Sequence, residues 1–125
     1  MQTRLPESLL RTRTCLEADG ILRNCVHCGF CNATCPTYQL TGNELDGPRG
    51  RIYLIKQMLE GHAPTDRTRL HLDRCLTCRA CETTCPSGVD YHHLLDTGRA
   101  RLASELPRSL PQRLLRYMLR QVMSR

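Results

Sequence analysis

The sequence has 125 residues, of which 18 are lysine or arginine and 12 are aspartate or glutamate, so its formal net charge is +6. It contains no tryptophan and one phenylalanine, which leaves little aromatic side chain for a core. A chain of this length is expected to form one domain with an appended helix, and the absence of any run of roughly 20 apolar residues excludes a transmembrane helix.

The positive charge is concentrated near the C-terminal end. Residues 1–98 hold eleven basic and eleven acidic residues, whereas residues 99–125 hold a single acidic residue, Glu105. Seven arginines supply the excess: Arg99, Arg101, Arg108, Arg113, Arg116, Arg120 and Arg125. Since the basic and acidic residues of the rest of the chain are equal in number, the positive net charge is only a weak argument for nucleic-acid binding.

The first predicted element is a modest amphipathic helix over residues 5–18, with Leu5, Leu9 and Leu16 on one side. Cys15 lies in this segment and has no partner at a metal-binding spacing. Because free cysteines behave as small hydrophobic residues, a buried or idle thiol is expected there rather than a metal ligand.

Two cysteine runs with the same spacing follow, fifty residues apart. In each run, three cysteines are separated by two residues, and a fourth follows after three more, directly before a proline. The first run is Cys25, Cys28, Cys31 and Cys35 with Pro36, and the second is Cys75, Cys78, Cys81 and Cys85 with Pro86. Thr34 and Thr84 correspond under the same offset. This repeat predicts two pseudo-symmetric halves.

The chain between the two runs predicts two helices. Gly47 and Pro48 open the first, because proline is tolerated in the first turn of a helix, and Gly61 ends it. Its apolar face is formed by Ile52, Ile55 and Leu59, backed by Leu54 and Met58. The second helix, from about Thr65 to Arg74, leads directly into the second cysteine run.

Two more helices follow the second run. Asp90 can cap the first of them, and Pro107 ends it; its residues at helical spacing are Tyr91, Leu94, Leu95, Gly98 and Leu102. His92 and His93 lie at its start and are expected to be surface or packing residues rather than ligands. The last helix begins near Pro111 and carries one apolar stripe, formed by Leu114, Leu115, Met118, Leu119 and Val122.

The spacing of each cysteine run is the bacterial signature for binding a [4Fe–4S] cluster. Three thiolates two residues apart can surround one side of a cluster. The fourth cysteine, held extended by the proline that follows it, can reach the other cluster, as happens in two-cluster ferredoxins. We therefore predict two clusters with crossed ligands: one bound by Cys25, Cys28, Cys31 and Cys85, and the other by Cys75, Cys78, Cys81 and Cys35.

Two other cysteine chemistries compete with this interpretation. Paired Cys-x2-Cys motifs also build zinc sites with four thiolates, but a third cysteine at the same spacing and a Cys-Pro end favour iron–sulfur clusters. Disulfides are disfavoured because no signal peptide precedes the cysteines and the cytosol keeps thiols reduced. The pattern thus predicts a protein that carries electrons, and the bound clusters are expected to supply much of its folding free energy.

Four basic or titratable residues lie close to the first and second runs. His27 and Arg79 either favour the reduced clusters through their charge or remain exposed loop side chains with little effect. Arg49 and Arg51 either contact a partner, neutralise thiolates, or lie in a solvated first helical turn.

No part of the sequence alternates between polar and apolar residues as an amphipathic strand would. We therefore predict an all-α fold, with a two-cluster domain over residues 1–106 and a basic amphipathic helix over residues 107–125. That helix is expected to dock on this domain or on a partner subunit, or to lie on anionic lipid as an interfacial helix.

Several stretches of the sequence resemble the N-terminal portion of the iron–sulfur subunits of glycolate oxidase (glycolate dehydrogenase). They are residues 25–31 (CVHCGFC), 35–38 (CPTY), 44–53 (ELDGPRGRIY), 72–78 (LDRCLTC) and 85–89 (CPSGV). The resemblance implies an α-helical ferredoxin domain that relays electrons from FAD on a flavin-containing dehydrogenase subunit while that subunit oxidises glycolate to glyoxylate. It also implies a location in the cytoplasm or at the inner face of the cell membrane, and electron flow towards the quinone pool.

Other functions stay open beside this one. Subunits of this family continue into domains with a Cys-Cys-Gly motif, but no cysteine follows Cys85. The sequence is therefore expected to be either a fragment, in which residues 107–125 begin a missing C-terminal region, or a shortened version of the subunit. A D-lactate or glycerol-3-phosphate dehydrogenase is an alternative flavin partner. From a different class, the alternative is an iron–sulfur or zinc module whose basic tail binds nucleic acid. On each interpretation, this chain supplies no acid, base or nucleophile for substrate chemistry.

Overall fold

The computed structural model describes residues 1–124, and all its elements are helices; Arg125, the last arginine of the predicted basic segment, lies outside the described residues. In chain order the elements are α1 (Glu7–Leu10), α2 (Arg13–Asn24), α3 (Phe30–Ala33), α4 (Pro36–Thr41), the 3-10 helix η1 (Glu44–Asp46), α5 (Pro48–Leu59), α6 (Asp66–Asp73), α7 (Ala80–Thr84), α8 (Tyr91–Glu105) and α9 (Leu110–Met123). Since no strand occurs among residues 1–124, the predicted all-α fold is confirmed.

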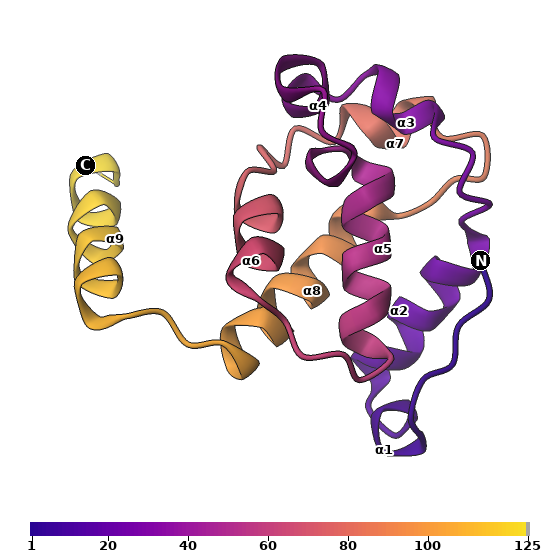
Figure 1. Ribbon diagram of the computed structural model, residues 1–125, viewed down its shortest axis with the longest axis horizontal. Helices are drawn as coiled ribbons and strands as arrows, with labels where there is room; N and C mark the ends of the chain where they lie inside the picture. The colour runs from indigo at the N-terminus through magenta and orange to yellow at the C-terminus, as the bar shows by residue number, and fades with distance from the viewer. Residues whose placement is uncertain (125) are drawn as a thin grey trace.

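Helix α5 forms the centre of the domain, between α2, α6 and α8 (Figure 1). It begins at Pro48 and ends before Gly61, as the sequence predicts. The predicted face of this helix is buried: Ile55 and Leu59 are fully buried and meet Leu94 and Leu95 of α8 in one core. Burying side chains of this size contributes about 1.5–3 kcal/mol each, so the α5–α8 contact is a main source of stability.

A glycine lets α5 and α8 approach each other closely. A Cβ atom at Gly98 of α8 would lie 2.6 Å from Cγ1 of Ile55, a fully buried side chain that has no room to move. Gly98 lies on the buried face of α8 because a residue without a side chain leaves room for Ile55. This explains why a glycine occurs among the predicted apolar positions.

The N-terminal segment differs from the predicted single helix over residues 5–18. The chain breaks at residues 11–12, and α2 then runs on to Asn24. The buried residues of α2 are Cys15, Ala18 and Leu22, whereas the predicted Leu16 is 51% exposed. Because Cys15 and Ala18 are small, α2 can pack closely against α8 with these two residues facing the core. The larger side chain of Leu16 is left on the exposed side of the helix. The expectation that Cys15 is a buried thiol is confirmed.

The remaining helix boundaries follow local capping chemistry. Thr65 and Thr68 form a capping box at the start of α6, and the Asp90 side chain accepts a hydrogen bond from the His93 amide at the start of α8. Helix α8 ends at Glu105, just before Leu106 and Pro107, because the residue preceding a proline disfavours helical backbone. The predicted cap and the predicted end of this helix are both confirmed.

Helix α9 stands apart from the other helices (Figure 1). Its basic side faces the domain: the Arg116 guanidinium lies 3.8 Å from Asp73, and Arg108, in the linker before the helix, lies 2.6 Å from the same carboxylate. No helix among the described residues has both the length and the apolar character needed to cross a bilayer. The linker between α8 and α9 falls at the predicted boundary, and the division into two units stays a prediction.

The contact at Gly98 predicts opposite effects for two glycine-to-alanine changes. Gly98→Ala should lower the free energy of unfolding by about 1–3 kcal/mol, because the new methyl group overpacks the core. Gly20→Ala, in α2, adds a methyl group that would meet no atom within 4 Å, so it should be neutral or stabilising by up to about 1 kcal/mol. Urea unfolding of the cluster-loaded variants, followed by circular dichroism, measures both. Equal effects at the two positions would show that the α5–α8 approach is not tight.

Candidate metal centre

The two cysteine loops have the same unusual backbone. Four residues lie in the left-handed region, at matching places in the repeat: His27 (φ 61°) and Gly29 (φ 86°) in the first loop, and Thr77 (φ 56°) and Arg79 (φ 61°) in the second. Three of the four carry side chains, for which this conformation is unfavourable. Alternating left-handed turns aim successive amide N–H groups into one concavity, and such concavities bind anions, including iron–sulfur centres. The loops are therefore shaped for an anionic group.

The fourth cysteine of each run leaves its loop on extended backbone. Cys35 has φ −85° and ψ 114°, and Cys85 has φ −74° and ψ 115°. The proline after each one disfavours helical backbone at the cysteine, so the predicted extended conformation is confirmed at both. Each fourth thiol thereby turns away from the three thiols that precede it in the sequence.

The two halves of the repeat meet through the short helices α3 and α7, which lie side by side (Figure 1). At their C-terminal ends, the Thr84 hydroxyl donates to the Thr34 hydroxyl at 3.2 Å. These two threonines correspond under the offset of fifty residues, so the contact joins like with like across a pseudo-twofold axis. This arrangement brings the fourth cysteine of each half beside the loop of the other half.

The cysteines line two cavities. The first is lined by Cys25, Cys28, Cys31, Cys81 and Cys85. The second is lined by Cys35, Cys75, Cys78 and Cys81. The fourth cysteine of each run thus lines the cavity of the other run, and Cys81 borders both. This grouping supports the crossed ligand assignment, which stays a prediction.

The thiols of the cavities need a positive partner to ionise together. Burial raises the pKa of Cys31 to about 11, and the neighbouring thiols of Cys25 and Cys85 add to the rise. Burial likewise raises the pKa of Cys81 to about 12, with Cys31 and Cys75 nearby. A bound metal centre deprotonates such thiols and offsets their mutual repulsion. Two sets of four converging sulfurs therefore fit two [4Fe–4S] clusters.

Cys35 lies in a different electrostatic environment from the other buried cysteines. Burial alone would raise its pKa, but hydrogen bonds from the Thr37 hydroxyl and the Tyr38 amide, together with the Arg51 charge, hold the pKa below its ordinary value. The Arg51 side chain is fully buried, and its Nη1 donates to the Cys35 sulfur at 3.9 Å. For Arg51, the solvated-turn interpretation is therefore wrong, and the structure supports thiolate neutralisation.

A second buried charge, Asp46, supports this region and was not predicted. Asp46 is fully buried at the end of η1; its Oδ1 lies 2.8 Å from His71 Nδ1, and its Oδ2 accepts from Arg74 at 2.8 Å. Burial would raise its pKa, but these two hydrogen bonds hold the pKa below the ordinary value. No periodic pattern marks Asp46 or His71, because their contact joins residues 25 positions apart. The only signal was the 44–53 stretch, which carries the family resemblance.

The other charged residues of the cysteine loops lie at the surface. The Arg79 guanidinium pairs with Glu82 at 2.8 Å on an exposed part of α7, and the half-exposed Arg49 pairs with Glu44 at 2.9 Å. The exposed His27 ring lies 3.4 Å from the Arg49 carbonyl oxygen. Their charges are neutralised or screened by water, which favours the interpretation that His27 and Arg79 are loop side chains with little effect on the clusters.

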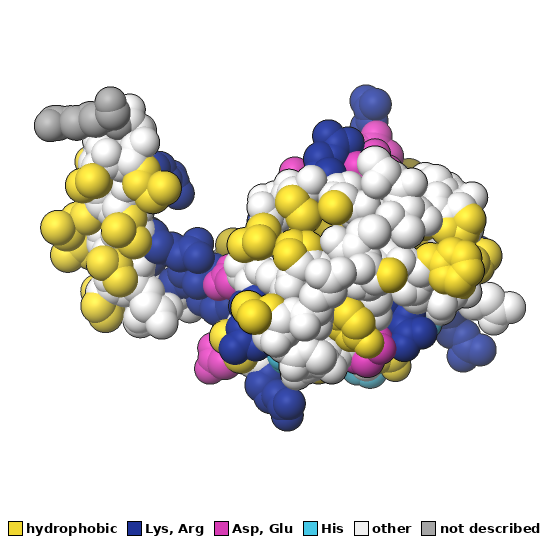
Figure 2. Space-filling model, turned by 90° about the horizontal axis from the view of Figure 1, so that it is seen from above, with side chains coloured by type: hydrophobic (Ala, Val, Ile, Leu, Met, Phe, Trp, Pro, Cys, Tyr) yellow, Lys and Arg dark blue, Asp and Glu magenta, His cyan; other side chains and the backbone are white. Residues whose placement is uncertain are grey.

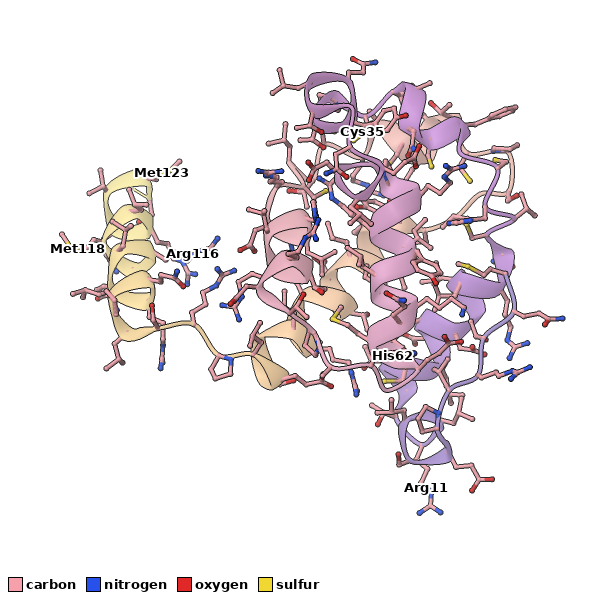
Figure 3. All side chains as sticks on the ribbon, in the orientation of Figure 1. Arg11, Cys35, His62, Arg116, Met118 and Met123 are labelled. Carbon is pink, nitrogen blue, oxygen red and sulfur yellow. The ribbon has the colours of Figure 1, made fainter. Side chains whose placement is uncertain are left out.

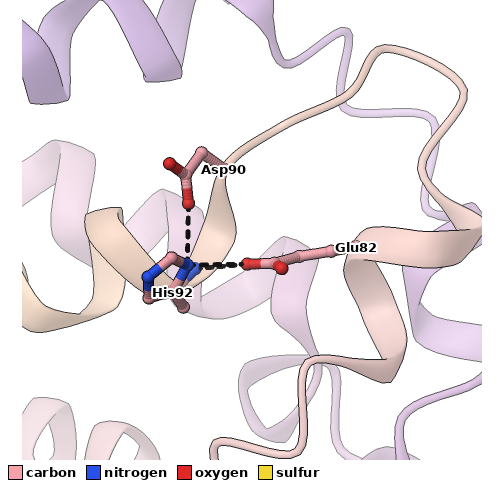
Figure 4. Close-up of side chains that lie close together, drawn as sticks. All are labelled: Glu82, Asp90 and His92. Atoms are coloured by element: carbon pink, nitrogen blue, oxygen red, sulfur yellow. Dashed lines mark hydrogen bonds and ion pairs between the residues drawn. The ribbon is translucent and has the colours of Figure 1, made fainter.

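His92 completes a small polar cluster at the start of α8 (Figure 4). Its Nδ1 lies 2.9 Å from Asp90 and 3.3 Å from Glu82. Glu82 also accepts from the His92 amide at 2.8 Å and pairs with Arg79, so its oxygens already have partners. The cluster ties α7 to α8, and His92 is a packing residue as predicted.

Comparisons with known proteins agree with this geometry. The sequence profile of the family described as 4Fe-4S dicluster domain matches residues 21–89. The chain is 66% identical over 125 residues to the glycolate oxidase iron–sulfur subunit of Escherichia coli (strain K12), which covers all of this chain and 31% of that protein.

More distant relatives share the same region. The chain is 44% identical over 100 residues to the probable glycolate oxidase iron–sulfur subunit of Bacillus subtilis (strain 168), covering 78% of this chain and 22% of that protein. It is 30% identical over 81 residues to the succinate dehydrogenase iron–sulfur subunit of Paracoccus denitrificans, covering 59% of this chain and 31% of that protein. The chain therefore spans less than a third of the length of these three relatives. No solved structure is significantly similar to it.

The crossed arrangement predicts which cysteine variants resemble one another. Cys35→Ser should damage the same cluster as Cys78→Ser, and Cys85→Ser the same cluster as Cys28→Ser, because each pair lines one cavity. Anaerobic purification with iron and sulfide analysis, followed by EPR of the reduced protein, distinguishes the two damage patterns. Each variant should retain roughly four irons in the other cluster. A Cys35→Ser spectrum that matches Cys28→Ser would contradict the crossed assignment.

Proposed function

Because the chain belongs to the family of 4Fe-4S dicluster domains, whose members carry two [4Fe–4S] clusters, we propose that it relays electrons within a glycolate oxidase. In this proposal it is part of an iron–sulfur subunit and accepts electrons from FAD on a partner subunit that oxidises glycolate to glyoxylate. The observation that carries the proposal is the pair of adjoining cysteine-lined cavities. The identity of the complex rests on the likeness to the Escherichia coli subunit along the whole chain.

When bound, [4Fe–4S] clusters supply one-electron redox chemistry at potentials set by their surroundings. The residues of this chain would bind the clusters and form the surroundings that set their potentials. Three cysteines of each loop and the fourth from the other half are proposed as ligands, and left-handed residues such as Gly29 aim amide groups at the sulfurs. Tyr91 lines both cavities from α8. Substrate oxidation is assigned to the partner.

The apolar side of α9 is proposed as the contact for that partner subunit. Its large apolar residues are all at least half exposed: Leu110, Leu114, Leu115, Tyr117, Met118, Leu119, Val122 and Met123. Most of them lie on the side that faces away from the domain (Figure 2), where Met118 points outward while Arg116 points towards the domain (Figure 3). A contiguous apolar face of this kind marks an interaction site. A protein occupant is favoured because the relatives are named as subunits.

The location is a further part of the proposal. We place the complex in the cytoplasm, at the inner face of the cell membrane, where electrons can pass towards quinones. An arginine-rich amphipathic helix with no acidic residue, such as α9, also has the composition of an interfacial helix that binds anionic lipid. Peripheral membrane contact through α9 is therefore the competing use of the same apolar face.

The proposed role predicts rapid reduction by a specific substrate. When the cluster-loaded protein is mixed anaerobically with its flavin-containing subunits, glycolate should bleach the visible absorbance of the clusters. D-lactate and glycerol 3-phosphate serve as matched controls, since their dehydrogenases are the alternative partners. Faster reduction by either one would reassign the complex. Binding of nucleic acid that weakens steeply with salt, without any substrate-dependent reduction, would contradict an electron-transfer role.

The α9 contact predicts selective loss of assembly. The double variant Leu115→Glu/Met118→Glu should lose co-purification with co-expressed flavin-containing subunits while it retains about eight irons. The control Leu40→Glu, at an 87% exposed position on α4, should still assemble.

Sedimentation with vesicles that contain anionic lipid identifies the competing occupant of α9. If the double variant still assembles but no longer binds these vesicles, whereas the wild type binds them, then α9 contacts the membrane and the protein contact is wrong.

A further inference from the structure

The two cysteine-lined cavities are not electrostatically equivalent, and Arg51 is the main difference. Its guanidinium is fully buried beside the second cavity. Nε donates to the His71 carbonyl oxygen at 2.7 Å, Nη2 to the Thr37 hydroxyl at 3.1 Å, and Nη1 to the Cys35 sulfur at 3.9 Å. Two of its three partners are neutral oxygens. The third is the Cys35 sulfur, which becomes an anionic partner once the thiol is ionised.

The nearby carboxylate of Asp46 makes its short hydrogen bonds to other groups. It lies 2.8 Å from both His71 and Arg74 but 4.0 Å from Arg51. Arg51 is thus the most distant of the three partners of Asp46, and its charge lies as close to the Cys35 sulfur, at 3.9 Å, as to this carboxylate. The positive charge of Arg51 therefore acts on the sulfur ligands of the second cavity as well as on Asp46.

A second buried donor lies at the same cavity. The Tyr91 side chain is only 5% exposed, and its hydroxyl donates to the Cys75 sulfur at 3.6 Å. Cys75 and Cys35 belong to the same predicted ligand set. Two buried side chains from α5 and α8 therefore donate hydrogen bonds to sulfurs of one set.

The first cavity has weaker positive partners among the described residues. Its Cys85 sulfur accepts from the Val89 amide at 3.5 Å. Of the basic side chains that line it, His27 is exposed and Arg49 is half exposed and paired with Glu44. The amino group of Met1 donates to the Cys25 carbonyl oxygen at 2.5 Å, but it is partly exposed, so water and salt screen its charge.

Reduction of a cluster by one electron adds one negative charge to its thiolate-bound core. Positive charge and hydrogen bonds to sulfur stabilise that extra charge, and they do so most strongly where water is excluded. We propose that Arg51 and Tyr91 are positioning residues that make the cluster of Cys35, Cys75, Cys78 and Cys81 the easier of the two to reduce. That cluster is then the electron acceptor within the pair, and the one bound by Cys25, Cys28, Cys31 and Cys85 is the donor. The inference rests on the crossed ligand sets of the proposed function.

A redox titration of the purified chain with dithionite, followed by EPR, tests this order. The Cys28→Ser and Cys78→Ser variants identify the signal of each cluster. In Arg51→Gln, the equilibrium constant for reducing the second-cavity cluster should fall at least tenfold, which corresponds to about 59 mV for one electron. The other cluster should shift much less. Tyr91→Phe should shift the same cluster in the same direction by a smaller amount.

Two further variants separate charge from structure. Arg51→Lys keeps the positive charge and should recover most of the lost potential, whereas a purely structural role would not respond to charge. Lys56→Gln removes a charge from α5 beside neither cavity and should change neither cluster. If Arg51→Gln fails to fold, Tyr91→Phe still measures the effect, because it removes only a hydroxyl group.

The outcomes distinguish this proposal from the proposed function. The titration needs neither glycolate nor a partner subunit, since dithionite supplies the electrons. Equal shifts of both clusters, or a wild-type protein in which the first-cavity cluster has the higher potential, would overturn the proposed order while leaving electron transfer intact. A chain that binds zinc and gives no EPR signal would overturn both.

Discussion

The structure depends on one constraint: neither half of the chain supplies all the sulfurs for one cavity. Three cysteines come from a loop of one half, and the fourth comes from the other half on extended backbone. The halves must therefore stay in register, which the α3–α7 contact and the Thr34–Thr84 hydrogen bond provide. Because the free energy of metal binding is also folding free energy, cluster loading and tertiary structure stabilise one another in this domain.

A buried polar network surrounds the second cavity and connects it to the helical core. Buried charges cost several kcal/mol each unless they are paired and hydrogen-bonded. Here Asp46 is held by His71 and Arg74, and Arg51 is held by backbone and hydroxyl oxygens as well as by a cysteine sulfur. The first cavity lacks such a network among the described residues. This asymmetry lets two similar sulfur cages hold their clusters at different potentials.

Local signals in the sequence were sufficient for much of the fold and for the cysteine sites. Pro48 and Asp90 begin helices where turn and cap chemistry predict them, and all eight cysteines of the repeated spacing line the two cavities. Non-local contacts were not predictable in the same way. The face that α2 buries depends on how closely α8 approaches, so the prediction of Leu16 on the buried side is wrong, and Ala18 is buried instead. The burial of Arg51 depends on η1 and α6 closing over it, which no pattern within α5 reveals.

We infer that two iron–sulfur clusters, held by sulfurs from both halves, form the working centre of this protein. The most direct measurement is iron and sulfide analysis of the anaerobically purified chain, combined with EPR after reduction. With both clusters bound, each chain should contain about eight irons and eight sulfides and show two magnetically interacting spins. Tightly bound zinc in a fully folded chain that gives no paramagnetic signal would contradict it.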